Sequence, residues 1–360
     1  TLGQFIPAIP YSKFISKSTS ALTNVLSLQQ VASSSAYRTN IGLVEAAGQA
    51  ASVLMRVFDD KNSLLAEIPV NLLAGSYVQD NYFAKNNLSF ADGRVEIQVT
   101  SSTGKVTAYA STIDNATNDP LLVSPVLKSS ISATHYVLPG IAALNTGLAN
   151  WRSDVRIYNA GSTDANATLT YVPMPGNPSA NGPVTVTLKS GEVASYDDIL
   201  KSSFGLNTDS GGALSIATDQ SSSLITSART YNLTTTGTLG QFIPGVTPND
   251  AIGNAEGSLQ LLQLEQSDRY RTNIGLAETA GQPATVEVTL FLPDSKVTPV
   301  YTVPLDANQF VQFPLAVFNA GTVYNGRVSV KVTSGSGRVT AYGSIIDAVT
   351  GDPTYVPQLK

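Results

Sequence analysis

The chain has 360 residues and a formal net charge of −5, and only 13% of its residues are charged. Because phosphate binding needs clustered Lys and Arg, this composition argues against a nucleic-acid partner. Cysteine is absent, which excludes disulfides and thiolate metal sites. The sequence contains no run of 18 apolar residues, so we expect no membrane-spanning helix.

The first predicted element is a strand with the sequence TLGQFIP at Thr1–Pro7, which recurs at Thr238–Pro244. The second copy takes the place of the last strand of a module. The first copy is therefore predicted to be an orphan strand, within residues 1–10, that has no module of its own before it. Two interpretations are open: Thr1 is a cut within a longer array of such modules, or the orphan strand docks on another molecule.

A first β-sandwich module is predicted over residues 11–130. In Arg94–Thr100 (RVEIQVT), apolar and polar residues alternate, which indicates a strand with one buried and one solvated face. The module also contains the sequence YRTNIGL at Tyr37–Leu43. Close to its end lies an Asp-x-x-Thr-x-Asp-Pro turn at Asp114–Pro120.

A second, more divergent module is predicted over residues 131–247. WRSDVRIYN at Trp151–Asn159 matches the strand that begins YRTNIGL in the first module. SARTYN at Ser227–Asn232 matches the strand that precedes the Asp-Pro turn. The second TLGQFIP sequence, at Thr238–Pro244, then closes this module.

The third predicted module covers residues 248–360 and repeats the first one. YRTNIGL returns at Tyr270–Leu276 and the Asp-Pro turn at Asp347–Pro353, with the same spacing between them. Short helical turns are expected at Tyr196–Phe204 in the second module and at Pro314–Asn319 in the third. The strands of the third module are predicted near Leu259–Leu264, Arg271–Glu278, Ala284–Leu292, Val300–Leu305, Arg327–Thr333, Arg338–Asp347 and Thr354–Gln358. Such short alternating strands predict an all-β protein of three tandem immunoglobulin-like β-sandwich domains.

The repeats resemble a known type of tandem module. The residues that carry the resemblance are HYVLPG (His135–Gly140), WRSDVRIYNAG (Trp151–Gly161), LQLE followed by YRTNIG (Leu262–Gly275), and AYGS followed by DAVTGDP (Ala341–Pro353). The chain is similar to repeats of two alternating types in secreted and surface proteins of environmental bacteria. The resemblance implies display outside the cytoplasm and a scaffold, adhesive or filament role, and it implies no enzymatic activity.

The acidic turns are the candidate metal sites. Asp114 and Asp119 in the first turn, and Asp347 and Asp352 in the last, present oxygens that Ca²⁺ prefers. A single turn supplies fewer than the six to eight ligands that Ca²⁺ takes, so these are weak candidates. The alternative is an Asx-type turn, in which each Asp accepts from its own backbone and Pro fixes φ.

Two further pairs recur with the same spacing, Arg38 with Asp114 and Arg271 with Asp347. We predict that each is a structural ion pair that ties two strands together. A ligand clamp is the alternative.

Catalytic machinery is not evident in the sequence. His135 is the only histidine, and no nucleophile motif accompanies it. The acidic residues are spread over turns, which does not favour a glycosidase pair. We therefore predict that the chain is not an enzyme and binds no cofactor.

The orphan strand suggests how the protein functions. Its apolar residues Leu2, Phe5 and Ile6 invite pairing with another molecule, and such a contact between copies would build a fibre. We therefore expect an extracellular or cell-surface structural protein that self-associates. The alternative is an adhesin stalk or a module that binds glycans or a surface, since the chain has 15 tyrosines and a Trp151 that is Tyr in the other modules.

Overall fold

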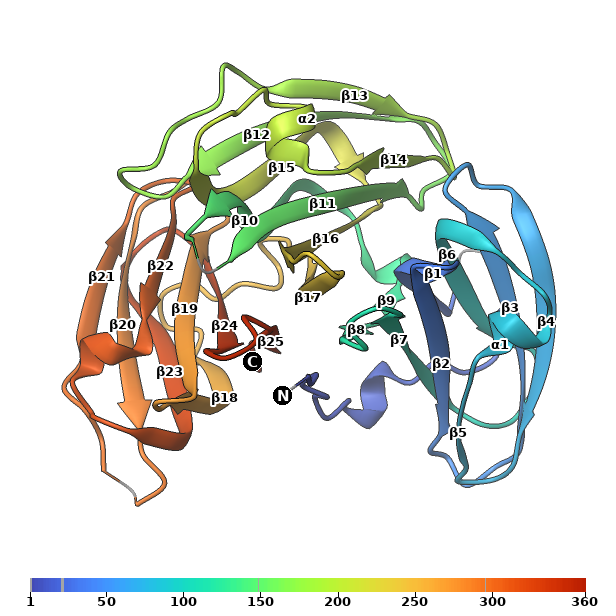
Figure 1. Ribbon diagram of the computed structural model, residues 1–360. Helices are drawn as coiled ribbons and strands as arrows, with labels where there is room; N and C mark the ends of the chain where they lie inside the picture. The colour runs from blue at the N-terminus through green and yellow to red at the C-terminus, as the bar shows by residue number, and fades with distance from the viewer. Residues whose placement is uncertain (1, 21–22, 148, 295) are drawn as a thin grey trace.

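The computed structural model describes residues 2–20, 23–147, 149–294 and 296–360. These residues form an all-β fold of antiparallel sheets with only short helical turns between the strands (Figure 1). Within the described ranges, no helix has the length and hydropathy needed to cross a membrane.

The first unit, as we call strands β1–β9, consists of two sheets that share one hydrophobic core. The sheets have the strand orders β4-β3-β6-β1-β9 and β5-β2-β7-β8. On β3, Val53, Met55 and Val57 are buried while Ser52, Leu54 and Arg56 between them are half-buried, so one face of the strand meets the core. The elements are η1 (Tyr11–Lys13), β1 (Val25–Ser33), β2 (Tyr37–Glu45), β3 (Ala51–Asp59), β4 (Leu64–Leu72), β5 (Tyr77–Asp80), α1 (Tyr82–Lys85), β6 (Phe90–Val99), β7 (Val106–Asp114), β8 (Pro120–Val123), β9 (Val126–Leu127) and η2 (Lys128–Ser130).

In the middle unit, β10–β17, one strand joins both layers into a single sheet. This strand, β10, pairs with β15 along most of its length and with β11 at Leu144 and Asn145. Its register shifts at Gly140, whose φ of 74° is one that glycine adopts without strain. The elements are β10 (Ala133–Asn145), β11 (Asn150–Asn159), β12 (Ala165–Pro173), β13 (Val184–Leu188), β14 (Val193–Tyr196), α2 (Ile199–Ser202), β15 (Ser210–Ser222), β16 (Leu224–Leu233) and β17 (Thr238–Pro244).

The third unit, β18–β25, again has two sheets around one core, with the orders β18-β23-β20-β21 and β22-β19-β24-β25. The predicted helical turns are present as α2 and η3, whereas the sequence pattern did not predict β22. The elements are β18 (Leu259–Gln266), β19 (Tyr270–Glu278), β20 (Ala284–Phe291), β21 (Tyr301–Leu305), β22 (Phe310–Pro314), η3 (Leu315–Phe318), β23 (Val323–Gly335), β24 (Val339–Asp347) and β25 (Pro353–Pro357).

All three units repeat the same strand order. The row β4-β3-β6-β1 corresponds to β13-β12-β15-β10 and to β21-β20-β23-β18. The row β5-β2-β7-β8 corresponds to β14-β11-β16-β17 and to β22-β19-β24-β25. The middle unit therefore shares the topology of its neighbours although its sequence has diverged from theirs.

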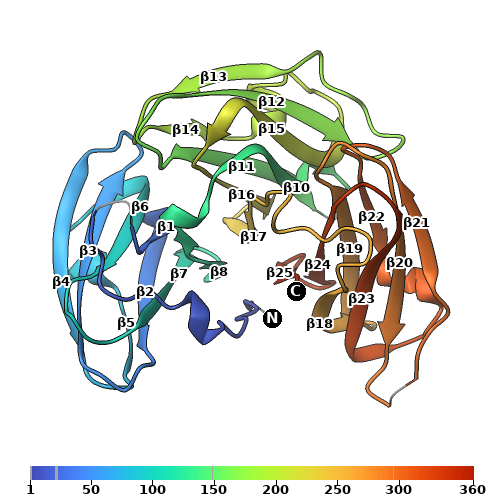
Figure 2. The same cartoon turned by 180° about the vertical axis from the view of Figure 1, so that it is seen from behind.

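The units form an open arc around a common centre, as Figures 1 and 2 show from opposite sides. The last long strand of each unit, β8, β17 or β25, lies at this centre, where β17 contacts both of the others. Residues 2–7 also lie there, between β8, β17 and β25. The centre of the arc is thus the place where all three units and the first TLGQFIP sequence meet.

The two interfaces along the arc differ in chemistry. The middle and third units meet through apolar contacts, among them Trp151 and Ile346, which share one buried cluster. The first and middle units meet through buried charges, where Lys128 Nζ lies 2.8 Å from Glu96 Oε1 and the Tyr158 hydroxyl donates to the same oxygen over 3.0 Å. Arg94 stacks on the Tyr158 ring.

Candidate functional site

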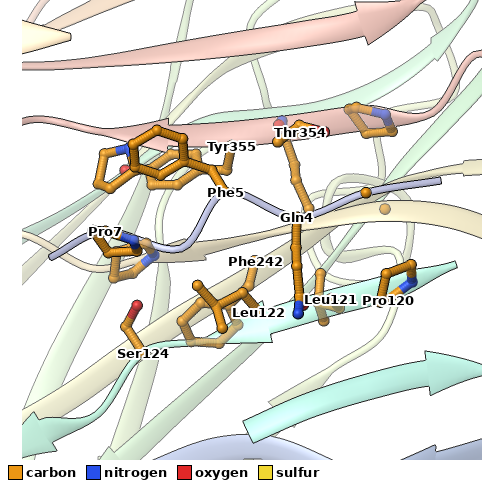
Figure 3. A pocket seen from close by; sticks show the side chains of 16 residues that line it. Gln4, Phe5, Pro7, Pro120, Leu121, Leu122, Ser124, Phe242, Thr354 and Tyr355 are labelled. Carbon is orange, nitrogen blue, oxygen red and sulfur yellow. The ribbon is translucent and has the colours of Figure 1, made fainter. Parts of the chain in front are cut away.

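The candidate site lies at the centre of the arc, where two acidic turns each receive one TLGQF sequence. Figure 3 shows the small cavity at this point, with Gln4 and Phe5 between β8 and β25. The volume of this cavity is about 40 Å³, which leaves room for little more than a water molecule. At this point β8, β17 and β25 therefore pack closely around Gln4 and Phe5.

The first acidic turn follows β7 and is closed by its own aspartates. Asp114 Oδ1 accepts from the backbone N–H of Ala116 (2.8 Å) and of Thr117 (3.1 Å). Asn118 has a φ of 62° and donates its N–H to the Asp114 carbonyl over 2.8 Å. These are the contacts of an Asx-type turn, and they leave Asp114 Oδ2 and Asp119 Oδ2 for other partners.

The acidic turn of the third unit has the same internal hydrogen bonds. Asp347 Oδ1 accepts from Val349 N (2.8 Å) and Thr350 N (3.1 Å). Gly351, with a φ of 74°, takes the place of Asn118 and donates to the Asp347 carbonyl over 2.8 Å. The shared Asp-x-x-Thr-x-Asp-Pro motif thus forms the same turn in both units.

The TLGQF sequence of the middle unit docks on the first turn. Thr238 donates to Asp114 Oδ2 twice, from its backbone N–H (2.9 Å) and from its hydroxyl (2.7 Å). Two residues later, Gly240 N–H donates to Asp119 Oδ2 over 2.7 Å. Although burial opposes it, the Thr238 hydroxyl and the surrounding backbone amides lower the pKa of Asp114. The carboxylates of this turn therefore bind the strand of the next unit.

The first TLGQF sequence makes an equivalent contact with the turn of the third unit. The Gly3 amide acts as a hydrogen-bond donor to the Asp352 carboxylate, as Gly240 does to Asp119. Thr1 lies outside the described residues. The predicted docking strand thus has its partner within this chain, at a turn nearly 350 residues away in the sequence.

The two TLGQF sequences bridge the first and third units crosswise. Gln241 accepts from the Ser344 hydroxyl of the third unit over 3.0 Å, and Gln4 accepts from the Ser111 hydroxyl of the first unit over 3.3 Å. Phe242 belongs to the core of the first unit, whereas Phe5 packs against the core of the third. Each sequence therefore holds the two outer units together.

Two buried carboxylates, Asp119 and Asp352, face each other across this junction. They are 3% and 2% exposed, and each has one oxygen, Oδ1, without a conventional donor. Burial and the neighbouring Asp119 carboxylate raise the pKa of Asp352, and burial also raises that of Asp119. Because two neighbouring buried carboxylates resist ionising together, we expect one of the two to keep its proton well above the usual pH range of an aspartate.

The predicted calcium ligands are therefore committed to other partners. Asp114 and Asp347 accept from backbone amides of their own turns, and Asp119 accepts from Gly240. Among the described residues, no group of three or more His, Asp or Glu side chains is placed to hold a metal ion. The geometry of both turns matches the Asx alternative.

The predicted ion pairs of Arg38 with Asp114 and of Arg271 with Asp347 are wrong. The strand register places Tyr37 opposite Asp114, and Tyr270 opposite Asp347. The following arginine in each strand points to the other face of the sheet. Arg38 instead donates to the side chains of Asn115 (2.8 Å) and Asn118 (3.2 Å), and Asp347 forms an ion pair with Arg269 at 3.5 Å.

The predicted assembly residues Leu2, Phe5 and Ile6 differ in burial. Residues 2–10 form no strand, since no neighbouring strand offers them a ladder of hydrogen bonds. Phe5 is partly buried, whereas Leu2 and Ile6 remain 39% and 62% exposed. The side chain at position 5 is thus the apolar anchor of this segment.

The other candidates have structural partners. The ring nitrogens of His135 contact the Thr279 carbonyl (2.6 Å) and the Ser215 hydroxyl (2.7 Å), so the ring connects the middle and third units. Trp151 is buried against the third unit, and the Tyr37 hydroxyl accepts from Arg229 of the middle unit over 2.9 Å. These aromatic residues line interfaces between units rather than an open surface.

Sequence reasoning missed the partnership between the two motifs. The sequence shows that the TLGQF sequence and the acidic turn are both repeated. It does not predict that one binds the other, as Gly240 does when it donates to Asp119. The available signal was that both motifs occur twice in this chain. The buried pair of Lys128 and Glu96 left no such signal, because the third unit has Ser329 in place of Glu96 and does not repeat the pair.

A family model matches part of the chain. Residues 86–211 match a family of unknown function (DUF5719), a stretch that runs from the first unit into the middle one. No curated protein matches the chain. The crystal structure of Thermotoga maritima 1070 is similar over 32% of this chain and 93% of its own length, with 12% identity and a TM-score of 0.24.

A second solved structure is Bacteroides uniformis β-glucuronidase 2 covalently bound to cyclophellitol-6-carboxylate aziridine. It is similar over 62% of this chain with 14% identity and a TM-score of 0.13, and the match spans only 25% of the glucuronidase chain.

Proposed function

We propose that this protein is an extracellular or cell-surface structural repeat protein, a subunit or segment of a filament or array, and not an enzyme. The observation that carries the proposal is the repeated junction, in which an acidic turn binds a TLGQF sequence twice. At this junction the carboxylates accept from backbone amides of another part of the chain. The most specific polar chemistry in the repeats therefore serves to join units.

The proposal includes three immunoglobulin-like domains, at residues 11–130, 131–247 and 248–360. In immunoglobulin sandwiches, strand B pairs with E in one sheet and C pairs with F in the other. In the first unit, β1 pairs with β6 and β2 pairs with β7, which are equivalent pairings, and β8 next to β7 corresponds to strand G. The other two units repeat this order, which supports one domain type used three times.

The proposed location outside the cytoplasm rests on composition. The chain lacks cysteine, has few charged residues, and resembles modules of secreted bacterial proteins. Fractionation of cells of the native host, with an antibody against this chain, tests the location. Recovery in the cytoplasmic fraction alone would contradict it.

Electron microscopy of the purified chain tests the structural role. We expect particles with three lobes in an arc, alone or joined end to end into longer arrays. A small-angle scattering profile that fits three independent, freely jointed domains would contradict the role proposed for the junction.

One observation favours a second candidate, a module that binds a glycan or a surface. A cavity of about 570 Å³ opens where all three units meet, a volume within the range of small-molecule sites. Its polar lining is mostly uncharged and includes Thr107, Thr340 and Gln358. A glycan array probed with the labelled chain tests this candidate. Binding that is lost in a Thr340→Trp variant would support it, and an array without signal would count against it.

A further inference from the structure

We propose that the acidic turn of the third unit is a binding site for the TLGQF segment of a second copy of this chain. The inference rests on the proposed structural function and names its partner. In this site, residues 3–5 of the second copy replace residues 3–5 of the same chain. The contacts are the same in both cases, so the exchange costs little apart from the association of two molecules.

The first argument is that the same sequence is held very differently at its two positions. In the middle unit, β17 pairs with β16 along its whole length, from Thr238 to Pro244, and all but the last of its residues are buried. Residues 2–10 have no such ladder. Among the described residues of the first copy, Gly3, Gln4 and Phe5 make the contacts described above.

The second argument is the loose fit of the first copy. A cavity of about 230 Å³ lies beside Gly3, Gln4 and Phe5, against the sheet of the third unit. Ile345 and Tyr270 of that sheet line it together with Phe5. The described part of this segment therefore has solvent-accessible space on one side, whereas β17 is buried from Thr238 to Ile243.

The third argument is reach. After residue 7, the chain makes its first backbone bridge to the first unit at Ile15, which pairs with Val106. The intervening residues include only the short turn η1, whose residues are exposed. Ten extended residues span roughly 33–36 Å. Phe5 can therefore leave its own third unit and reach that of a neighbouring molecule while Ile15 stays in place.

The occupant we infer is a second copy because the chain itself carries the matching sequence. The turn at Asp347–Pro353 repeats the turn at Asp114–Pro120, and both receive a TLGQF sequence. A segment tethered in the same chain has an effective concentration of about millimolar, so exchange becomes visible when the tethered segment is weakened.

The experiment mixes two variants of the full chain. The Phe5→Ala variant has an intact turn but a weakened segment, and the Ile345→Gln variant has an intact segment but a damaged site. Each is expected to be a monomer alone. Light scattering after size-exclusion chromatography of the mixture should show a complex of twice the mass, whereas a mixture that stays monomeric would overturn the proposal. In the control mixture, Phe5→Ala is combined with a Tyr324→Gln variant in place of Ile345→Gln. Tyr324 is 64% exposed, so its replacement leaves the site intact, and this mixture should give no such complex.

A second measurement does not depend on the folding of Ile345→Gln. A fluorescent peptide with the sequence of residues 1–7 is titrated with the Phe5→Ala chain, beside a peptide in which the phenylalanine is alanine. Saturable binding of the first peptide and at least tenfold weaker binding of the second support the site. Equal or absent binding of both overturns it. If the site fails while particles keep the three-lobed arc, the structural function stands; if the arc itself is absent, that function is wrong.

Discussion

At the scale of single residues, the facing carboxylates of Asp119 and Asp352 predict that the stability of the junction depends on pH. Burial and the facing carboxylate raise the pKa of Asp352 from 3.8 to about 8. The other charged groups near Asp119 are Arg229, which lowers its pKa, and Asp114, which raises it. Between about pH 4 and pH 8 the folded chain thus binds more protons than the unfolded chain, so its stability falls as pH rises through this window.

We expect the Asp352→Asn variant to lose this dependence, because a neutral amide replaces the protonated acid. Thermal unfolding between pH 4 and pH 9 measures it. The parent chain should lose about 1–3 kcal/mol over this range relative to the variant. Parallel pH profiles for the two proteins would show that neither carboxylate keeps its proton in this range.

The buried charges between the first and middle units make a second prediction at this scale. Lys128 is 7% exposed and lies against Glu96, which is 4% exposed. The Lys128→Met variant leaves Glu96 with Arg94 and Tyr158 as partners, so we expect a loss of about 2–4 kcal/mol in the free energy of unfolding. Lys201→Met, at an exposed position, is the control and should change it by less than about 0.5 kcal/mol. Equal effects in urea denaturation would refute the assignment.

The corrected role of Arg38 gives a third prediction. Its partners are the exposed side chains of Asn115 and Asn118, whereas Asp114 accepts from several donors in two units. We expect Arg38→Ala to cost less than about 1 kcal/mol, and Asp114→Ala to cost about 2–4 kcal/mol because buried amides lose their acceptor. Chemical denaturation of both variants measures the two losses in the free energy of unfolding. Similar losses would indicate that Arg38 and Asp114 form an ion pair after all.

At the scale of elements, the two TLGQF segments are one sequence in two states. As β17 it is a ladder-paired strand, and as residues 2–7 it is an irregular segment with one apolar anchor. We expect Phe242→Ala to destabilise the chain by about 3–5 kcal/mol, since Phe242 is buried in the first core, and Phe5→Ala to cost less than half as much. Guanidinium denaturation of the two variants measures the difference. Equal losses would mean that both segments are bound equally firmly.

The elements also show what sequence patterns can and cannot predict. Alternation in Val95, Ile97 and Val99 depends only on neighbours within one strand, so the strand was predicted. The solvated face expected for it was wrong, because Arg94, Glu96 and Gln98 are also buried. β22 was missed because FVQFP is short, ends in proline and runs into η3. The supposed pairing of Arg38 with Asp114 failed because equal spacing in two repeats does not reveal the register, and a shift of one residue moves a side chain to the other face.

At the scale of the whole molecule, the repeats predicted three copies of one pattern but not their arrangement. The arc depends on contacts such as that of Gly240 with Asp119, which join residues far apart in the sequence. A second unrepeated set, Lys128 with Glu96 and Tyr158, fixes the first unit against the middle one. Such contacts leave no periodic trace in a single sequence.

The arrangement leads to a prediction for the complete chain. Removal of residues 1–7 deletes one of the two bridges between the first and third units and leaves Gln241 with Ser344. We expect the radius of gyration from small-angle scattering to rise by a few per cent, while circular dichroism retains the β-sheet signal of the three cores. An unchanged scattering profile would show that β17 alone determines the shape of the arc.

The crosswise bridge also affects how the molecule responds to mechanical tension. A force that pulls Leu2 and Lys360 apart acts first on the contacts of Gly3, Gln4 and Phe5, because they join distant parts of the chain directly. These few contacts separate one after another, whereas in each antiparallel sheet many hydrogen bonds share the load at the same time. Because β17 also bridges the outer units through Gln241 and Ser344, the arc opens only when these contacts separate as well. We expect both bridges to separate before any core unfolds, so that the junction acts as an extensible link.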